Sequence, residues 1–209
     1  MKRIISLLIL ICVFSCCLIS CDRSYDENEV LCAARVLIEK SGPLNYIIWG
    51  GGIKYIEGGD EGSYREADPE DLKKYGFETV EELKKQISEV YTAGYCESIF
   101  STVFSSWGDE DGILGLARYI QEYSDRENTV PKRIMVYSNA NVFIKDEIEY
   151  LFDTLKVIGS EKEAVYVEIT VKVTRDGDAQ MHTKKIALLE EENCWRIDSP
   201  TYMNYIVNN

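Results

Sequence analysis

Ala164–Leu189 reads AVYVEITVKVTRDGDAQMHTKKIALL and carries the clearest structural signal in the chain. In its first ten residues, valine and isoleucine alternate with tyrosine, glutamate, threonine and lysine, which is typical of a strand with one buried face. Asp176-Gly177 is a strong turn signal between two strands, because both residue types tolerate a positive φ. Thr183–Leu189 then returns as the partner strand. The stretch therefore predicts an antiparallel hairpin.

Shorter apolar segments on both sides of this hairpin predict further strands. Three of them lie upstream, at Ile134–Tyr137, Val142–Ile144 and Leu155–Ile158, and a last one lies at Cys194–Asp198. Adjacent strands that are joined by tight turns pair in antiparallel fashion. The second half of the chain is therefore predicted to be mainly sheet, over residues 130–200.

The first half carries helix signals instead, over residues 29–107. Apolar residues recur at helical spacing from Asn28 to Lys40, and we expect Ser41-Gly42-Pro43 to interrupt this helix. A second helical turn follows and should stop at Gly50-Gly51-Gly52, since glycine tolerates the left-handed conformation of a helix exit. Further expected elements are a loop over Gly58–Asp68 with an extended piece at Tyr64–Ala67, a helix start at Asp68-Pro69 and a capping box at Thr79–Glu82. The helix behind the capping box should bury Leu83, Ile87, Val90 and Tyr91, and a further helix should span Tyr95–Ser106.

Helices first and a meandering sheet after them define an α+β fold class, with N-terminal helices packed on a twisted antiparallel sheet. No repeat, low-complexity tract or proline-rich linker divides the chain, so residues 29–209 are predicted to form a single domain. The layout, which ends in the strand Trp195-Arg196-Ile197-Asp198, resembles NTF2-like and cystatin-like domains. Such domains are common in envelope lipoproteins, and the resemblance implies a cone-shaped fold with a concave sheet face.

The first 21 residues predict where the protein resides. Met1-Lys2-Arg3 is a positive start, Ile4–Ile19 contains no charge and no proline, and Leu18-Ile19-Ser20-Cys21 closes the apolar segment. This pattern resembles a bacterial lipoprotein signal, which implies that residues 1–20 are removed and that Cys21 carries lipid such as palmitate. Residues 21–28 are then a tether to the extracytoplasmic face of the cell membrane. An uncleaved anchor is the alternative, but sixteen apolar or small residues fall short of the roughly 18–20 that span a bilayer.

The net charge of the chain indicates which classes of macromolecule it can bind. The chain has 36 acidic and 23 basic residues, and its net charge is −13. Removal of residues 1–20 takes away Lys2 and Arg3 and no acid, so the charge of the mature chain becomes −15. Nucleic acids and anionic lipid head groups repel such a protein, so we expect no nucleic-acid partner. A basic protein such as a cell-wall enzyme fits better, and an acidic surface that only keeps the protein soluble is the alternative.

Motifs for catalysis or metal binding are absent from the sequence. The single histidine, His182, is not part of a Ser/His/Asp or Cys/His pattern. Asp109-Glu110-Asp111-Gly112 lacks the ligand spacing of a calcium-binding EF-hand loop. The mature chain keeps Cys32, Cys96 and Cys194, which are too far apart in sequence for a zinc site and allow at most one internal disulfide, whose pairing stays open. We therefore predict no catalytic residue, no metal and no cofactor.

Aromatic residues and one acid are the candidate binding residues. In a cone-shaped α+β fold, aromatic side chains often line the concave sheet face, and they also anchor protein interfaces. Core filling is the alternative role for these residues. Asp198 is a candidate because an inward-facing acid acts as the base in ketosteroid isomerases, which share the NTF2-like fold. The candidates are Tyr46, Trp49, Tyr55, Trp107, Trp195, Asp198 and Tyr202.

A narrower resemblance suggests a function. Tyr46–Gly52, Leu83–Thr92 and Trp195–Asp198 match in order an aromatic-Gly-Gly segment, a helix and a closing Trp-x-Ile-Asp strand. This order resembles the secreted inhibitors of peptidoglycan DL-endopeptidases of the IseA type. The resemblance implies a non-catalytic binding protein of the cell envelope that inhibits or regulates a peptidoglycan hydrolase. The alternatives are a small-ligand protein with an apolar cavity between sheet and helices, and a divergent isomerase-like enzyme with Asp198 inside a pocket.

Overall fold

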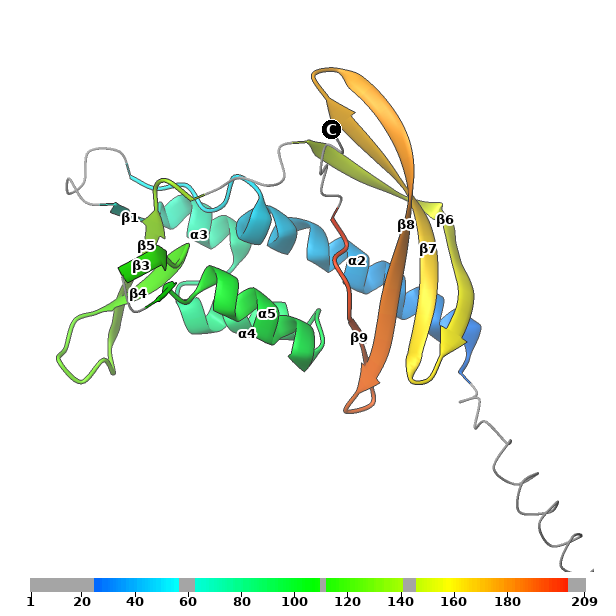
Figure 1. The fold of residues 1–209 in the computed structure, drawn as a ribbon, viewed down its shortest axis with the longest axis horizontal. Helices are drawn as coiled ribbons and strands as arrows, with labels where there is room; N and C mark the ends of the chain where they lie inside the picture. The colour runs from blue at the N-terminus through cyan, green and yellow to red at the C-terminus, as the bar shows by residue number, and fades with distance from the viewer. Residues whose placement is uncertain (1–24, 57–62, 110–111, 141–145, 203–209) are drawn as a thin grey trace, which may run out of the picture.

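One long helix, α2 (Glu27–Trp49), forms the axis of the molecule in the computed structural model, which describes residues 25–56, 63–109, 112–140 and 146–202. A curved four-stranded sheet lies across the N-terminal half of α2, and shorter helices and small sheets surround its other end (Figure 1). The predicted α+β fold, with helices packed on an antiparallel sheet, is confirmed. The assignment to an NTF2-like or cystatin-like family stays a prediction.

Helix α2 is continuous, so the predicted break at Ser41-Gly42-Pro43 is wrong. Pro43 lies inside the helix, where a proline costs about 3 kcal/mol. The apolar face of α2 nevertheless runs through this point, because Leu37 and Ile38 before it and Leu44 and Ile48 after it are all buried. Each such side chain contributes about 1.5–3 kcal/mol when it is buried. The summed burial on both sides of Pro43 therefore outweighs the local cost.

Several helix starts and stops lie where the sequence predicts them, whereas α5 spans Ala93–Val103 and not the predicted Tyr95–Ser106. Asp26 caps α2 by accepting a hydrogen bond from the Asn28 N–H at 2.9 Å, and the helix stops at Gly50. Thr79 and Glu82 form both halves of the predicted capping box. These local signals are confirmed. The remaining helices are α3 (Pro69–Tyr75), α4 (Val80–Ser88) and α5 (Ala93–Val103).

The large sheet is antiparallel, with the strand order β6-β7-β8-β9. Its central hairpin turns at Asp176 and Gly177, whose φ angles of 51° and 89° are the positive values that the turn requires. Val165 and the alternating apolar residues that follow it are at most 3% exposed and belong to the core beside α2. The predicted central hairpin is therefore confirmed. The strands are β6 (Glu147–Glu161), β7 (Ala164–Arg175), β8 (Asp178–Glu191) and β9 (Cys194–Ile197).

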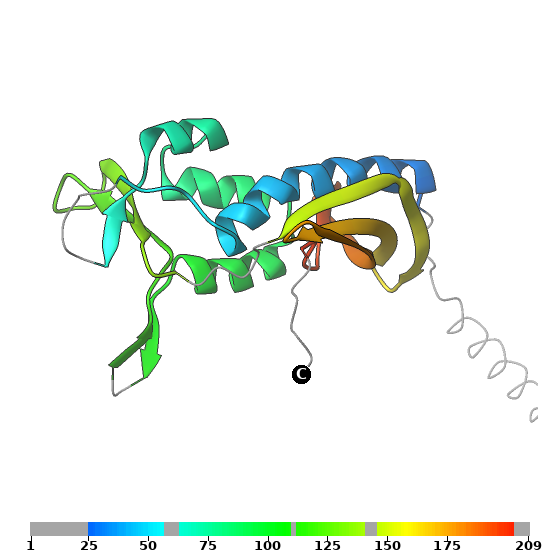
Figure 2. The ribbon, with the colours of Figure 1, turned by 90° about the horizontal axis from the view of Figure 1, so that it is seen from above.

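The small sheets contain three strands that are absent from the prediction, namely β2, β3 and β4. They are three to five residues long, which is too short for a period to be visible. The β2–β3 hairpin extends away from the helices (Figure 2), and β5 pairs with both β1 and β4. The predicted strand Val142–Ile144 lies outside the described residues. The bounds are β1 (Tyr64–Glu66), β2 (Trp107–Asp109), β3 (Gly112–Gly115), β4 (Tyr119–Tyr123) and β5 (Pro131–Tyr137).

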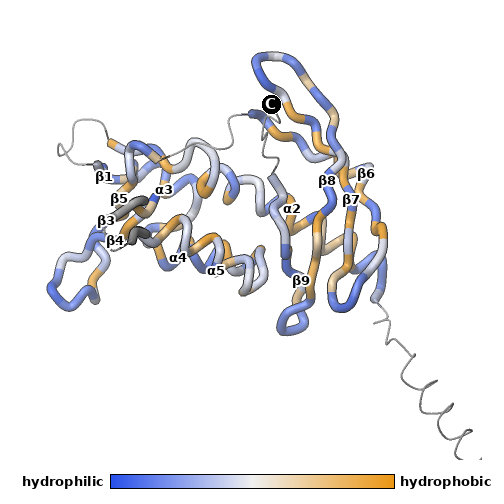
Figure 3. The backbone as a smooth tube through the Cα atoms, in the orientation of Figure 1, coloured by the Kyte–Doolittle hydropathy of each residue, from blue (hydrophilic) through white to orange (hydrophobic). Residues whose placement is uncertain are grey.

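Hydrophobic residues follow the inner strands and the helix faces that meet them (Figure 3). They form one core that extends from Val30 in α2 to Val103 in α5. Cys96 is buried, whereas Cys32 and Cys194 are exposed, and all three thiols are free. Within the described ranges, none of the helices combines the length and the apolar character needed to cross a membrane.

Candidate functional site

A buried polar cluster joins α2 to the last described residues. Thr201 is fully buried, and its Oγ1 accepts a hydrogen bond from Asn45 Nδ2 at 2.7 Å. Ser41 Oγ lies 2.8 Å from the same oxygen and donates to the Ile38 carbonyl, so the Thr201 hydroxyl donates to Ser41. Tyr91 Oη donates to Asn45 Oδ1 at 2.8 Å. Each hydroxyl proton in the cluster therefore has an acceptor, which offsets the cost of burying these groups.

Beside this cluster, a groove separates α2 from the first residues of β6, and we call it the α2–β6 groove. Its volume is about 440 Å³, which lies within the roughly 300–1,000 Å³ of typical ligand sites. Tyr150 connects the groove to the polar cluster, since its Oη donates to the Thr201 carbonyl at 3.0 Å. Tyr46 is 46% exposed on the α2 side. The groove is lined by Gly42, Asn45, Tyr46, Asp146, Glu147, Ile148 and Tyr150.

The β6 side of the groove carries carboxylates. Asp146 accepts hydrogen bonds from Arg175 Nε at 2.6 Å and from Nη2 at 2.7 Å. Glu147, the next residue, is exposed. The groove therefore combines the Tyr46 ring on α2 with the exposed Glu147 carboxylate on β6, whereas Asp146 is already paired with Arg175. This combination suits a partner that presents both apolar and basic groups.

Two glycines determine how Tyr46 lies. A Cβ atom on Gly51 would be 2.4 Å from Tyr46 Oη, and a Cβ atom on Gly50 would be 2.9 Å from Tyr46 Cδ2. The phenol ring therefore lies against the backbone at these two positions, an approach that a residue with a Cβ atom would block. The glycines that follow α2 thus have two roles, because they end the helix and they leave room for the ring.

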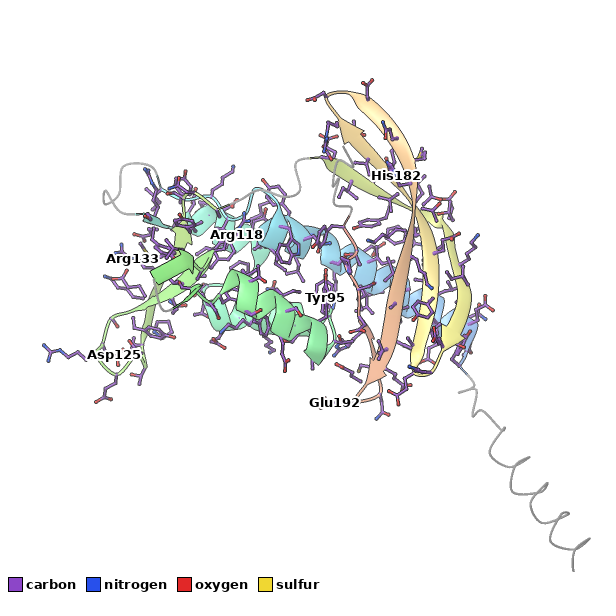
Figure 4. The ribbon with its side chains drawn as sticks, viewed as in Figure 1. Tyr95, Arg118, Asp125, Arg133, His182 and Glu192 are labelled. Carbon is purple, nitrogen blue, oxygen red and sulfur yellow. The ribbon has the colours of Figure 1, made fainter. Side chains whose placement is uncertain are left out.

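A strip of aromatic side chains continues from the groove toward α5. Trp49 packs against Tyr202, with ring centroids 5.7 Å apart, and Lys184 Nζ donates to the Tyr202 carbonyl at 3.1 Å. Tyr95 follows, in the space between α5 and β9 (Figure 4). Burial raises the pKa of Tyr95, and the neighbouring Tyr202 and Asp198 raise it further. The strip therefore connects the groove to Asp198 at the end of β9.

Asp198 is exposed at the outer end of this strip. Its Oδ1 accepts a hydrogen bond from Thr92 Oγ1 at 2.5 Å, and its N–H donates to the Ala187 carbonyl at 2.9 Å. Thr92 is also the N-cap of α5, so these bonds tie the end of β9 to that helix. An isomerase-like base has to lie inside a pocket. The exposed position of Asp198 therefore removes the main support for the isomerase alternative.

The other aromatic candidates lie elsewhere, so the candidates with described side chains do not line one face of the large sheet. Tyr55 packs under Arg65, whose guanidinium carbon is 5.3 Å from the ring centroid. Trp195 lines a hollow of about 140 Å³ at the N-terminal end of α2, together with Glu29. Trp107 is part of β2, and its side chain lies outside the described part. The structure thus brings together Tyr46, Trp49, Tyr202 and Asp198.

Most groove and cluster residues are missing from the sequence candidates, among them Tyr95, Ile148 and Tyr150. Ile148, Tyr150 and Phe152 alternate in sequence, and this period-two signal points to a strand that begins earlier than Leu155. Tyr95 lies four residues after Tyr91, a spacing that brings side chains together on a helix. The polar cluster has no comparable signal, because Asn45 and Thr201 are 156 residues apart.

Among the described residues, no group of three or more histidine, cysteine, aspartate or glutamate side chains is arranged to hold a metal ion. No protein-family model matches the chain, and no curated protein matches it. The function of the site therefore has to be argued from its own geometry.

Proposed function

We propose that the protein is a lipid-anchored lipoprotein on the extracytoplasmic face of the cell membrane and acts there as a non-catalytic binding protein. The α2–β6 groove carries the binding part of this proposal, since it is open and combines aromatic side chains with carboxylates. The exposed Tyr46 is the expected anchor for a partner, because tyrosine and tryptophan dominate the binding energy of protein interfaces.

The anchor is proposed from the sequence of the N-terminus. Cys21 closes the lipobox, and α2 begins six residues later at Glu27. Six extended residues span at most about 21 Å, so the lipid holds the start of α2 close to the membrane. Gly42, at the groove, lies fifteen residues farther along α2, which corresponds to about 23 Å of helix. The groove is therefore well separated from the anchored end.

The partner we propose is a basic peptidoglycan hydrolase that this protein inhibits or regulates. A mature charge of −15 attracts basic proteins over distances comparable to the Debye length and speeds their association. The exposed carboxylate of Glu147 at the groove adds short-range complementarity to a lysine or arginine of the partner.

The anchor is tested with the full-length chain in bacterial cells that are fed a clickable palmitate analogue. The wild-type protein should take up the label and sediment with membranes, whereas Cys21→Ala should do neither. Cys17→Ala is the matched control, because this cysteine lies in the apolar segment ahead of the lipobox and should leave labelling unchanged. A labelled, membrane-bound Cys21→Ala protein would contradict the anchor.

The binding role is tested with the lipidated mature chain as bait in envelope extract. We expect it to recover a peptidoglycan hydrolase and, as a purified protein, to slow that enzyme on isolated cell walls. Tyr46→Ala should weaken the interaction about tenfold. Val36→Ala is the control, since Val36 lies on the same helix and is also 46% exposed. Failure to recover a hydrolase, together with unslowed wall digestion, contradicts this function.

The volume of the groove also favours a second candidate, a small apolar ligand. A groove of about 440 Å³ can take a drug-sized molecule. A bound ligand raises the melting temperature in proportion to the logarithm of its concentration over its dissociation constant. A ligand screen by thermal shift should therefore identify compounds that stabilise the wild-type protein and leave Tyr46→Ala unshifted.

A further inference from the structure

Strand β6 contains a bulge between the segment that lines the α2–β6 groove and the rest of the strand. Leu151 lies opposite Thr170 of β7, and the next paired residue, Lys156, lies opposite Glu168. Five steps along β6 therefore correspond to two steps along β7, so β6 carries three extra residues here. A β-bulge bends its strand and changes the direction in which the side chains point.

The odd number of extra residues reverses the alternation of side chains along β6. Before the bulge, Ile148, Tyr150 and Phe152 pack against the core, whereas after it Leu155 and Val157 do so. Successive side chains of a strand point to opposite faces, so a β6 without the bulge could not direct both Tyr150 and Val157 inward. The bulge therefore places Tyr150 at the groove while Val157 stays packed on the core.

The side chain of Thr154 closes the bulge. Its Oγ1 accepts a hydrogen bond from the Thr170 N–H at 2.8 Å and donates to the Leu151 carbonyl at 2.7 Å. These two backbone groups lie where the regular pairing of β6 with β7 is interrupted. A backbone group that loses its partner in a partly buried position destabilises the segment to which it belongs. The Thr154 hydroxyl therefore takes the place of a backbone group in the ladder.

We propose that Thr154 is a positioning residue of the α2–β6 groove, whose hydroxyl holds residues 147–151 in the register that directs Ile148 and Tyr150 toward α2. Among the described strands, β6 pairs with β7 alone and forms an edge of the large sheet (Figure 1). This segment therefore depends on its single ladder and on the bulge that ends it. The positioning does not depend on the proposed function. One consequence rests on that function, namely that an envelope partner binds less tightly when the Thr154 hydroxyl is removed.

The proposal is tested by the chemical accessibility of a thiol on each side of the bulge. Ile148→Cys reports on the segment at the groove, and Val157→Cys reports on β6 after the bulge, because both side chains pack against the core. Both reporters are made in the mature chain with its lipobox cysteine and its two exposed cysteines changed to serine. The buried Cys96 is then the only other thiol in that chain.

Thr154→Val should raise the rate of reaction with a maleimide at Ile148→Cys about tenfold. Valine has nearly the shape of threonine but makes neither hydrogen bond, and the loss of two ordinary hydrogen bonds shifts a local opening equilibrium by about this factor. The rate at Val157→Cys should stay unchanged, because that residue follows the bulge and opens only with a larger part of the sheet. An unchanged rate at Ile148→Cys, or a parallel rise at both reporters, overturns the positioning role.

Two control variants separate the hydroxyl from the rest of the side chain. Thr154→Ser keeps the hydroxyl and should keep the slow rate at Ile148→Cys, so a fast rate in this variant overturns the proposal. Thr183→Val makes the same change at an exposed position of β8 and should leave both rates unchanged. No partner is present in these measurements, so their outcome is separate from that of the proposed function.

Hydrogen exchange of the wild-type protein tests the same contact without any substitution. The Thr170 N–H donates to the Thr154 side chain, and we expect it to exchange as slowly as the β7 amides that donate to backbone carbonyls. Rapid exchange of the Thr170 amide, with its neighbours in β7 protected, would show that the bulge is open and would overturn the proposal.

Discussion

Arg118 closes the C-terminal end of α2 by donating from Nη2 to the Gly50 carbonyl at 2.6 Å (Figure 4). Its Nη1 also donates to the Ile48 carbonyl at 3.2 Å, and the residue is only 8% exposed. The last carbonyls of a helix have no partner within the helix, and the helix dipole favours a cation beside them. Arg118 therefore stabilises the end of α2 that carries Tyr46 and Trp49.

Loss of this guanidinium should destabilise the protein. Arg118→Met leaves the Gly50 and Ile48 carbonyls without these charged donors, and we expect the free energy of unfolding to fall by about 3 kcal/mol. The measurement is guanidinium chloride denaturation followed by circular dichroism. Lys156→Met is the control, since Lys156 pairs with Glu168 on the surface and should cost under about 0.5 kcal/mol. Equal losses in the two variants would argue against the capping role.

Gly52 should not tolerate a side chain. Its φ is 76°, and a Cβ atom would lie 2.5 Å from Arg118 Nη2 and 2.7 Å from Tyr119 Oη. Gly52→Ala should therefore lower the free energy of unfolding by about 2 kcal/mol. Gly94→Ala, in the open first turn of α5, should instead be neutral or stabilise by up to about 1 kcal/mol. Thermal denaturation of both variants gives the comparison, and a stable Gly52→Ala protein would refute the close approach.

The polar cluster should depend on the Thr201 hydroxyl. Thr201→Val leaves Asn45 Nδ2 without this acceptor, and we expect a loss of about 1–3 kcal/mol in denaturant unfolding. A double-mutant cycle with Asn45→Ala should give a coupling energy of about 1 kcal/mol. Thr102→Val on the exposed side of α5 should cost under about 0.5 kcal/mol. A coupling energy near zero would show that the cluster does not act as a unit.

Buried tyrosines should make the protein unstable at alkaline pH. Burial raises the pKa of Tyr91, Tyr95, Tyr119 and Tyr150 above the ordinary value of 10. Above pH 10 the unfolded chain therefore binds fewer protons than the folded protein, so the free energy of unfolding falls as the pH rises further. Below pH 10 both states are protonated, and this contribution is fully present.

This pH dependence can be followed by tyrosinate absorbance between pH 9 and 12. We expect the fully buried Tyr91 and Tyr119 to ionise only when the protein unfolds, and the half-buried Tyr95 and Tyr150 to ionise after the exposed tyrosines. Tyr91→Phe should reduce the late phase and leave the early phase unchanged. A single titration of all 14 tyrosines without unfolding would contradict the raised pKa values of Tyr91 and Tyr119.

The accuracy of the sequence predictions depends on how local each signal is. The capping box at Thr79–Glu82 and the turn at Asp176-Gly177 are confirmed because each involves residues within a few positions of one another. Pro43 is also a local signal, but it is overridden by apolar residues on both sides that bury a continuous face of α2. Strands β2 to β4 are too short for a period and depend on pairing with distant segments.

The sequence indicates only some residues of the candidate site. Tyr46, Trp49 and Tyr202 are candidates because they are aromatic. Their grouping depends on α2 meeting the C-terminal segment across more than 150 residues. Tyr150 is not among the sequence candidates. The predicted strand begins at Leu155, whereas β6 begins at Glu147 and so includes Tyr150.

The capping box, the central hairpin, the acidic charge and the predicted lipid anchor follow from the sequence alone, because each depends on composition or on neighbours a few residues apart. The Arg118 cap, the polar cluster around Thr201 and the α2–β6 groove exist only in the folded protein. These features bring together side chains whose contacts leave no periodic pattern in the chain. A groove between a helix and a sheet edge forms only when both elements are packed on the common core. The same packing determines which exposed aromatic side chains lie close together.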